Sequence, residues 1–180
     1  SNTTGDRHVA LGYSALKANT TGYRNNAIGY LALTTNTTGF ENNALGVNAL
    51  RYNTTGAYNV AVGHEALLNN TTASGNSAFG YLTMAANTEG EFNTALGREA
   101  LEANTTADNN TAVGFRALTS NTTAPNNVAV GRDALGTNTT GAQNTAVGYQ
   151  SLFSNVTHTT LTAVGYQALY NNTADDNTAV

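Results

Sequence analysis

Three histidines, His8, His64 and His158, are the side chains of this sequence best suited to proton transfer or metal binding near neutral pH. A metal site or a catalytic base needs several such groups to converge on one place. The three histidines are far apart in the chain and occupy three different positions of the repeat described below. We therefore expect no shared metal site and no catalytic base among them.

The charged pairs of the sequence do not form a catalytic pattern either. Arg98-Glu99 and Arg132-Asp133 are sequence neighbours, and neighbouring side chains of a strand point to opposite faces. We interpret both pairs as solvated surface, because their members would not converge in a cleft.

Nucleophile and phosphate-binding motifs are also missing from the sequence. Asp175 and Asp176 fall in an expected turn, without the second carboxylate at fixed separation that glycoside cleavage needs. Serine and threonine are plentiful, but no base and orienting group accompany one of them, and no glycine-rich loop leads into Gly-Lys-Ser/Thr. The sequence predicts a protein that is not an enzyme, with no cofactor and no metal.

The composition is unusual for a globular chain of 180 residues, because only 10% of the residues are charged, against roughly 25% in a typical domain. The net charge of −4 is spread along the chain, which argues against a nucleic-acid partner. No apolar run approaches the length of a membrane span, so we expect no membrane insertion. Cysteine is absent, which excludes disulfides and thiolate metal sites and leaves the redox compartment open.

A tandem repeat runs through residues 1–180 and explains this composition. Alanine, an aliphatic residue or Phe, and glycine recur every 17 residues, from Ala10-Leu11-Gly12 and Ala27-Ile28-Gly29 to the end of the chain, where Ala179-Val180 follows after 16. We treat the chain as a single tandem-repeat domain and as a segment of a longer array, because no capping segment of different composition appears at either end.

Several columns of this repeat hardly vary. One column is leucine, with Met84 as its exception, and a second holds asparagine with His8 and Leu161 as exceptions. A further column is asparagine throughout, and we expect its amides to form a structural ladder along the stack. The members of this predicted ladder are Asn19, Asn36, Asn53, Asn70, Asn87, Asn104, Asn121, Asn138, Asn155 and Asn172.

A unit of 17 residues is too short for a helical repeat, and its apolar residues cluster in short segments between turns rich in Gly, Asn and Thr. We therefore predict an all-β parallel β-solenoid of about ten 17-residue coils, each with two short strands and two turns. Besides forming ladders, the asparagines are expected to adopt the left-handed backbone conformation that tight turns demand, as is the invariant glycine.

Both members of the pairs Ala10-Leu11 and Ala15-Leu16 stay apolar in nearly every repeat. If each pair lies on a strand, the sheet is apolar on both faces and is expected to be buried on both. One face lines the inside of the coil. The other predicts a homo-oligomer, in which small alanines let the backbones of neighbouring copies approach closely. End-to-end stacking of coils into a filament is expected for the same chain.

The unit N-T-A-V-G-Y-x-A-L resembles the repeats of trimeric autotransporter adhesin heads, in which an N-S-x-A-I-G-type motif builds a left-handed parallel β-roll. It is also similar to A-V-G-Y-x-A-L-x-x-N-T-T-G arrays of tail-fibre-like and bacterial surface proteins, as in Ala146-Val147-Gly148-Tyr149. The resemblance covers the whole chain and implies a homotrimeric fibre at the cell surface, on a virion or elsewhere outside the cell. The adhesin repeats are shorter, so the extra residues must widen a turn.

The column after the strand glycine is a candidate surface for binding a glycan or a receptor, because it is largely aromatic. Alternatively, its rings stack on one another or fill a seam between subunits. The column also includes Val47, His64, Arg98 and Arg132. The aromatic members are Tyr13, Tyr30, Tyr81, Phe115, Tyr149 and Tyr166.

Threonine pairs such as Thr20-Thr21 and Thr37-Thr38 suggest an ice-binding solenoid as an alternative function, although adjacent threonines cannot both face outward from a strand. Asn-x-Thr sequons recur at Asn19 and equivalent positions, and we interpret them as a by-product of the ladder. The sequence favours a structural or adhesive fibre module whose main partner is itself, outside the cell or on a virion.

Overall fold

The computed structural model describes residues 2–180, and those residues form a single parallel β-sheet with no helix. None of them therefore belongs to a helix that is long and apolar enough to cross a lipid bilayer. The strands are β1 (Val9–Leu11), β2 (Asn26–Ile28), β3 (Asn43–Leu45), β4 (Val60–Val62), β5 (Ser77–Phe79), β6 (Thr94–Leu96), β7 (Thr111–Val113), β8 (Val128–Val130), β9 (Thr145–Val147), β10 (Thr162–Val164) and β11 (Thr178–Ala179).

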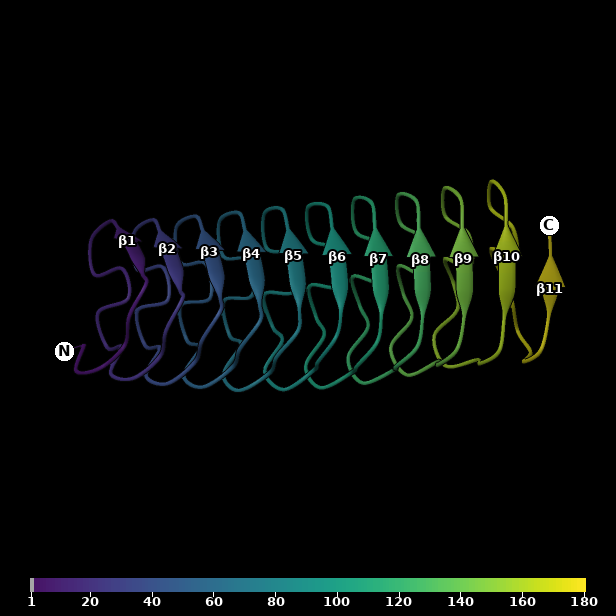
Figure 1. Cartoon of the computed structure of the whole chain (residues 1–180). Coiled ribbons are helices and arrows are strands. Elements are labelled where there is room, and N and C mark those ends of the chain that lie inside the picture. The colour runs from purple at the N-terminus through teal and green to yellow at the C-terminus, as the bar shows by residue number, and fades with distance from the viewer. Residues whose placement is uncertain (1) are drawn as a thin grey trace.

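Each strand pairs in parallel with the next strand along the chain, from β1 to β11 without a crossover. Equivalent residues of successive repeats lie opposite each other, so that Ala27 pairs with Ala44, 17 residues later. The final step is shorter, since Ala163 pairs with Ala179. The strands follow one another along one axis, with the two ends of the chain at opposite ends of the rod (Figure 1). The predicted parallel β-solenoid of 17-residue coils is confirmed.

Each coil contains one strand, whereas the sequence had predicted two. The second predicted strand, represented by Ala32-Leu33, is a turn. Leu31 and Leu33 have left-handed φ values of 57° and 48°, and a strand cannot contain such residues. Because the alternation of a strand does not apply there, Ala32 and Leu33 are both fully buried inside the coil. The prediction that the members of this pair point to opposite faces is wrong.

The core is built from alanines and one leucine column. Within β6, Ala95 is buried while Thr94 and Leu96 are exposed, so the small residue of the strand faces inward. The prediction that the alanines face neighbouring copies is therefore wrong. The turn supplies the large side chains that fill the coil. These are Leu16, Leu33, Leu50, Leu67, Met84, Leu101, Leu118, Leu135 and Leu152, all buried, with Leu169 packed against them.

Backbone hydrogen bonds between coils continue outside the strands. In the leucine turn the amide of Leu50 donates to the carbonyl of Ala66 over 3.0 Å, and in the threonine turn the amide of Thr37 donates to the carbonyl of Thr54 over 2.9 Å. Each turn is thus tied to the equivalent turn of the next coil. Turns held in this way repeat the same backbone shape, which fixes where every side-chain column runs.

The glycine that follows each strand is required for two reasons. Gly97 has a φ of 137°, which side chains other than glycine rarely tolerate. A Cβ atom at Gly97 would also lie 2.5 Å from the carbonyl oxygen of Gly114 in the next coil. The glycines therefore stack on one another, and they let the chain turn directly after the strand.

Candidate functional site

The predicted asparagine column lies inside the rod, and we call it the first ladder. At Asn87, the side-chain amide Nδ2 donates to Oδ1 of Asn70 over 2.9 Å and to the carbonyl of Gly90 over 3.0 Å. Its Oδ1 accepts from Nδ2 of Asn104 over 2.8 Å. The same contact joins each asparagine to the next from Asn19 to Asn155. Every one of these amides is buried.

Asn172 departs from this pattern. Its Nδ2 donates to the carbonyl of Ala174 over 2.5 Å, and its Oδ1 accepts from Nδ2 of Asn177 over 2.7 Å. The last repeat is one residue shorter than the others, which shifts the position of its turn relative to the coil before it. The first ladder therefore ends at Asn155, and at its other end Nδ2 of Asn19 donates to Oδ1 of the exposed Asn2 over 3.2 Å.

A second ladder uses the asparagine that precedes each strand. At Asn42, Nδ2 donates to Oδ1 of Asn25 over 3.2 Å and to the carbonyl of Gly56 over 2.8 Å, and the backbone amide of Asn42 donates to the same Oδ1 of Asn25. The two exceptions are accommodated differently. His8 accepts from the amide of Asn25 through Nδ1, and Leu161 is buried as an apolar replacement.

Of the residues expected to have a positive φ, the invariant glycine does, as at Gly97, but the asparagines of the two ladders do not. None of the first-ladder asparagines has a positive φ. The left-handed residues are instead the buried leucine, the residue two before it, and the residue before the second ladder, as at Leu101, Glu99 and Phe92, with φ values of 53°, 58° and 57°. The expectation that left-handed turns explain these asparagines is wrong, because hydrogen bonding along the stack accounts for them.

The aromatic column after the strand glycine forms stacks on the surface. The ring centroids of Tyr13 and Tyr30 are 5.4 Å apart, and those of Tyr149 and Tyr166 are also 5.4 Å apart. His64 and Tyr81 stack at the same distance. Spacing of this kind follows from identical positions one coil apart.

Two arginines of this column extend the stack between the rings. The guanidinium carbon of Arg98 lies 5.5 Å from the ring centroid of Tyr81 and 5.7 Å from that of Phe115. Arg132 lies 5.5 Å from Phe115 and 5.8 Å from Tyr149. Rings and guanidinium groups therefore alternate from Tyr81 to Tyr149, held by cation–π attraction.

The same arginines form ion pairs with their sequence neighbours. A guanidinium nitrogen of Arg98 is 2.8 Å from Oε1 of Glu99, and Nε of Arg132 is 3.1 Å from Oδ2 of Asp133. The prediction that these neighbours point to opposite faces is wrong, because Glu99 and Asp133 have left-handed φ values of 58° and 56°. Each guanidinium is thus neutralised beside the ring it contacts.

The first threonine of each Thr-Thr pair uses its hydroxyl within the stack. Oγ1 of Thr54 donates to the carbonyl of Thr71 over 3.1 Å, and Oγ1 of Thr71 donates to the carbonyl of Thr88 over 3.2 Å. The second threonine of the pair, such as Thr55, is exposed. The row of first threonines presents methyl groups, with the hydroxyl hydrogens directed at the backbone.

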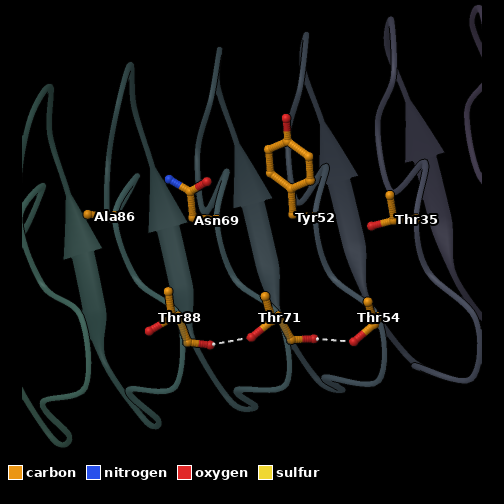
Figure 2. Close-up of a pocket in the computed structure, with 7 residues that line it drawn as sticks. All are labelled: Thr35, Tyr52, Thr54, Asn69, Thr71, Ala86 and Thr88. Carbon is orange, nitrogen blue, oxygen red and sulfur yellow. Dashed lines mark hydrogen bonds between the residues drawn. The ribbon is translucent and has the colours of Figure 1, made fainter.

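A shallow groove of about 580 Å³ runs along this threonine row (Figure 2). The opposite side is formed by the residue two positions earlier in each coil, and there Tyr52 stands above smaller neighbours such as Asn69. Arg51 lies 5.0 Å from the ring centroid of Tyr52. The sequence pattern did not predict this groove. The available signal was a single tyrosine in a column otherwise made of small or polar residues.

The titratable residues considered at the start remain dispersed. Within residues 2–180, no three His, Cys, Asp or Glu side chains come together in a way that could hold a metal ion. His64 lies 4.0 Å from Glu65, while Asp175 accepts a hydrogen bond from the backbone amide of Thr159. Asp176 accepts from the hydroxyl of Thr160. These carboxylates bind the coil before them.

Comparison with known proteins gives no relative from which a role could be transferred. No protein-family model, no curated protein and no solved structure matches the chain.

Proposed function

We propose that this chain is a structural module of a surface fibre, a tail fibre or an extracellular filament, and that it provides length and a repeated surface. The observation that carries the proposal is the first ladder, whose buried amides are hydrogen-bonded coil after coil from Asn19 to Asn155. Such a chain uses its buried polar groups to hold a constant cross-section.

The dimensions of the rod support this role. Eleven strands spaced about 4.8 Å apart extend over about 50 Å. Each coil contacts only its neighbours, so the length grows with the number of repeats. The resemblance of the repeat to adhesin heads and tail-fibre arrays points the same way, and from it we propose a homotrimer located outside the cell or on a virion.

Attachment to a glycan or receptor is the second part of the proposal. The column from Tyr13 to Tyr166, interrupted by Val47, and the groove beside Tyr52 present aromatic rings to solvent, and rings of this kind can pack against the apolar faces of sugars. The aromatic column recurs along the rod, which suits binding to several equivalent groups on one target, whereas Tyr52 is the single aromatic residue of its own column.

Ice binding is less well supported by the threonine row. The hydroxyls of Thr54 and Thr71 donate to backbone carbonyls, so their hydrogens are not available to surface water. The parallel row across the groove contains Thr35, Tyr52 and Asn69, which does not give a flat, regular array. We therefore expect the purified chain to show no thermal hysteresis, and clear hysteresis would favour the alternative.

Immunogold electron microscopy of intact source cells and of virions tests the proposal. Antibodies against the folded chain are expected to decorate filaments on these surfaces, and antibody preabsorbed with the purified chain serves as the control. Labelling confined to the interior of sectioned cells would contradict a role in a surface or virion fibre.

A further inference from the structure

The outer face of the sheet carries a column of large apolar side chains that nothing in the described chain covers. Leu11, Leu45 and Leu96 are 66%, 48% and 49% exposed, although they belong to strands whose alanines are buried. The strands lie in one row along the rod (Figure 1). We call this column the outer stripe. Its members are Leu11, Ile28, Leu45, Val62, Phe79, Leu96, Val113, Val130, Val147 and Val164.

The outward-facing strand positions also hold no charged residues. The column beside the outer stripe, formed by the first residue of each strand, holds only Val, Asn, Ser and Thr, from Val9 to Thr178. The acidic and basic residues of the chain all occupy other columns, including the ion-paired Arg98 and Glu99. Ten consecutive coils that keep a solvent-facing position apolar and its neighbour uncharged resemble the core of a protein interface more than a solvated surface.

We propose that the outer stripe is the surface on which another copy of this chain packs, with the two rods side by side along their length. This inference rests on the self-assembly included in the proposed function and assigns a face to it. The stripe repeats once per coil, so a partner must present features with the same rise to fit along its whole length. A second copy has the same rise because it consists of the same coils.

The available area is close to that of such a contact. A face of eleven strands is about 50 Å long, and a strip about 15 Å wide on it covers about 700 Å². A stable protein–protein interface buries about 800 Å² of each partner. The stacked rings and arginines from Tyr81 to Tyr149 begin two residues after the stripe, beyond the strand glycine, and would form the polar rim of this interface.

Sedimentation equilibrium of the full chain tests the assignment. The unchanged chain is expected to sediment as two or three copies at micromolar concentrations, and the double variant Leu45→Glu/Leu96→Glu as a single copy with an unchanged circular dichroism spectrum. The matched control is Tyr58→Glu/Phe92→Glu, which places the same charges on two residues that are 57% and 61% exposed in another column. This control should keep the mass of the unchanged chain.

A spin-label measurement covers the case in which the charged variant does not fold. The chain contains no cysteine, so Thr111→Cys on the outer face and Thr123→Cys in an exposed threonine turn can each be labelled singly. Labels at Thr111 are expected to lie close together between copies, with strong dipolar broadening, and labels at Thr123 farther apart. An unchanged chain that is monomeric, a stripe variant as assembled as its parent, or broadening that is stronger at Thr123 would each overturn the assignment.

These outcomes are separable from those of the proposed function. A chain found on fibres by immunogold but monomeric in solution would overturn the interface and leave the fibre role. A chain that assembles through the outer stripe but labels only the interior of cells would overturn the fibre role and leave the interface.

Discussion

At the scale of single residues, the asparagine amide is the group on which the interior depends. Asn87 uses both hydrogens of its Nδ2 and one acceptor position of its Oδ1 in a fully buried position. Leaving one buried polar group unpaired costs about 1–3 kcal/mol. A change at Asn87 affects Asn70, Gly90 and Asn104 together, so its cost should exceed that of one lost hydrogen bond.

Asn87→Asp tests this dependence with almost no change in shape. An ionised carboxylate at this position would face the carbonyl oxygens of Asn70 and Gly90 without a hydrogen to donate, and burial would raise the pKa of the new side chain. A raised folded-state pKa makes the penalty largest when the group is ionised. We expect the free energy of unfolding to fall by about 3 kcal/mol at pH 7 and to recover partly at acidic pH, measured by urea denaturation.

Asn109→Asp is the matched control for this change. Asn109 is exposed, has a left-handed φ of 59°, and belongs to neither ladder. Aspartate tolerates that conformation almost as well as asparagine. The control should leave the unfolding free energy nearly unchanged at both pH values. An equal loss in both variants would mean that the ladder is not the cause.

Glu102 gives a second pH-dependent test. Partial burial raises the pKa of its carboxyl group, with a smaller contribution from the nearby charge of Glu99. A raised folded-state pKa means that ionised Glu102 opposes folding at neutral pH, and that this opposition disappears as the pH falls below the folded pKa. Glu102→Gln should therefore raise the melting temperature at pH 7 and have little effect at pH 3. Glu89→Gln, at an exposed position, should leave the melting temperature nearly unchanged at both pH values.

Residue columns could be predicted from the sequence because the coils stack in register, and a fixed spacing then places identical residues above one another, as with Asn70 and Asn87. The left-handed conformation of Leu101 could not be predicted in the same way. Leucine normally avoids a φ of 53°, and here buried packing and bonds between turns hold it. That compensation comes from neighbouring coils and leaves no local sequence signal.

At the scale of the coil, the strand and the two kinds of turn bury different side chains. The strand buries only a small side chain, Ala95 in β6, while the following turn buries Ala100 and Leu101. The apolar pair of this turn predicted a strand because it resembles the apolar pair in β6. Two successive apolar residues point to opposite faces on a strand. In the turn, the residue two before the leucine and the leucine itself are left-handed, and both members of the pair then face inward.

Leu101→Ala and Leu96→Ala separate these two environments within one coil. Leu101 is fully buried and Leu96 is 49% exposed. Removing Leu101 leaves a cavity, so we expect a loss of about 2–5 kcal/mol in unfolding free energy at every protein concentration. Leu96→Ala should cost little in the single chain and should reduce stability only where copies assemble. Denaturation at several protein concentrations distinguishes the two, and equal losses at high dilution would contradict the assignment of faces.

At the scale of the whole molecule, the chain is a rod whose parts interact only with their neighbours in the stack. Many of its hydrogen bonds join residues one coil apart, as between Asn53 and Asn70, and no segment of residues 2–180 folds back over the outer stripe. The period alone was enough to predict this architecture. It was not enough to predict which apolar column faces outward, because that depends on where each turn reverses the chain.

The distance between spin labels along one column tests the rod most directly. The chain has no cysteine, and Thr21, Thr106, Thr123 and Thr140 are exposed members of one column. Pairs of labels joining Thr21 to the other three, diluted with unlabelled chain, should lie about 24, 29 and 34 Å apart, because each added coil contributes about 4.8 Å. Distances that do not rise by equal steps would contradict the stacking of coils in register along one axis.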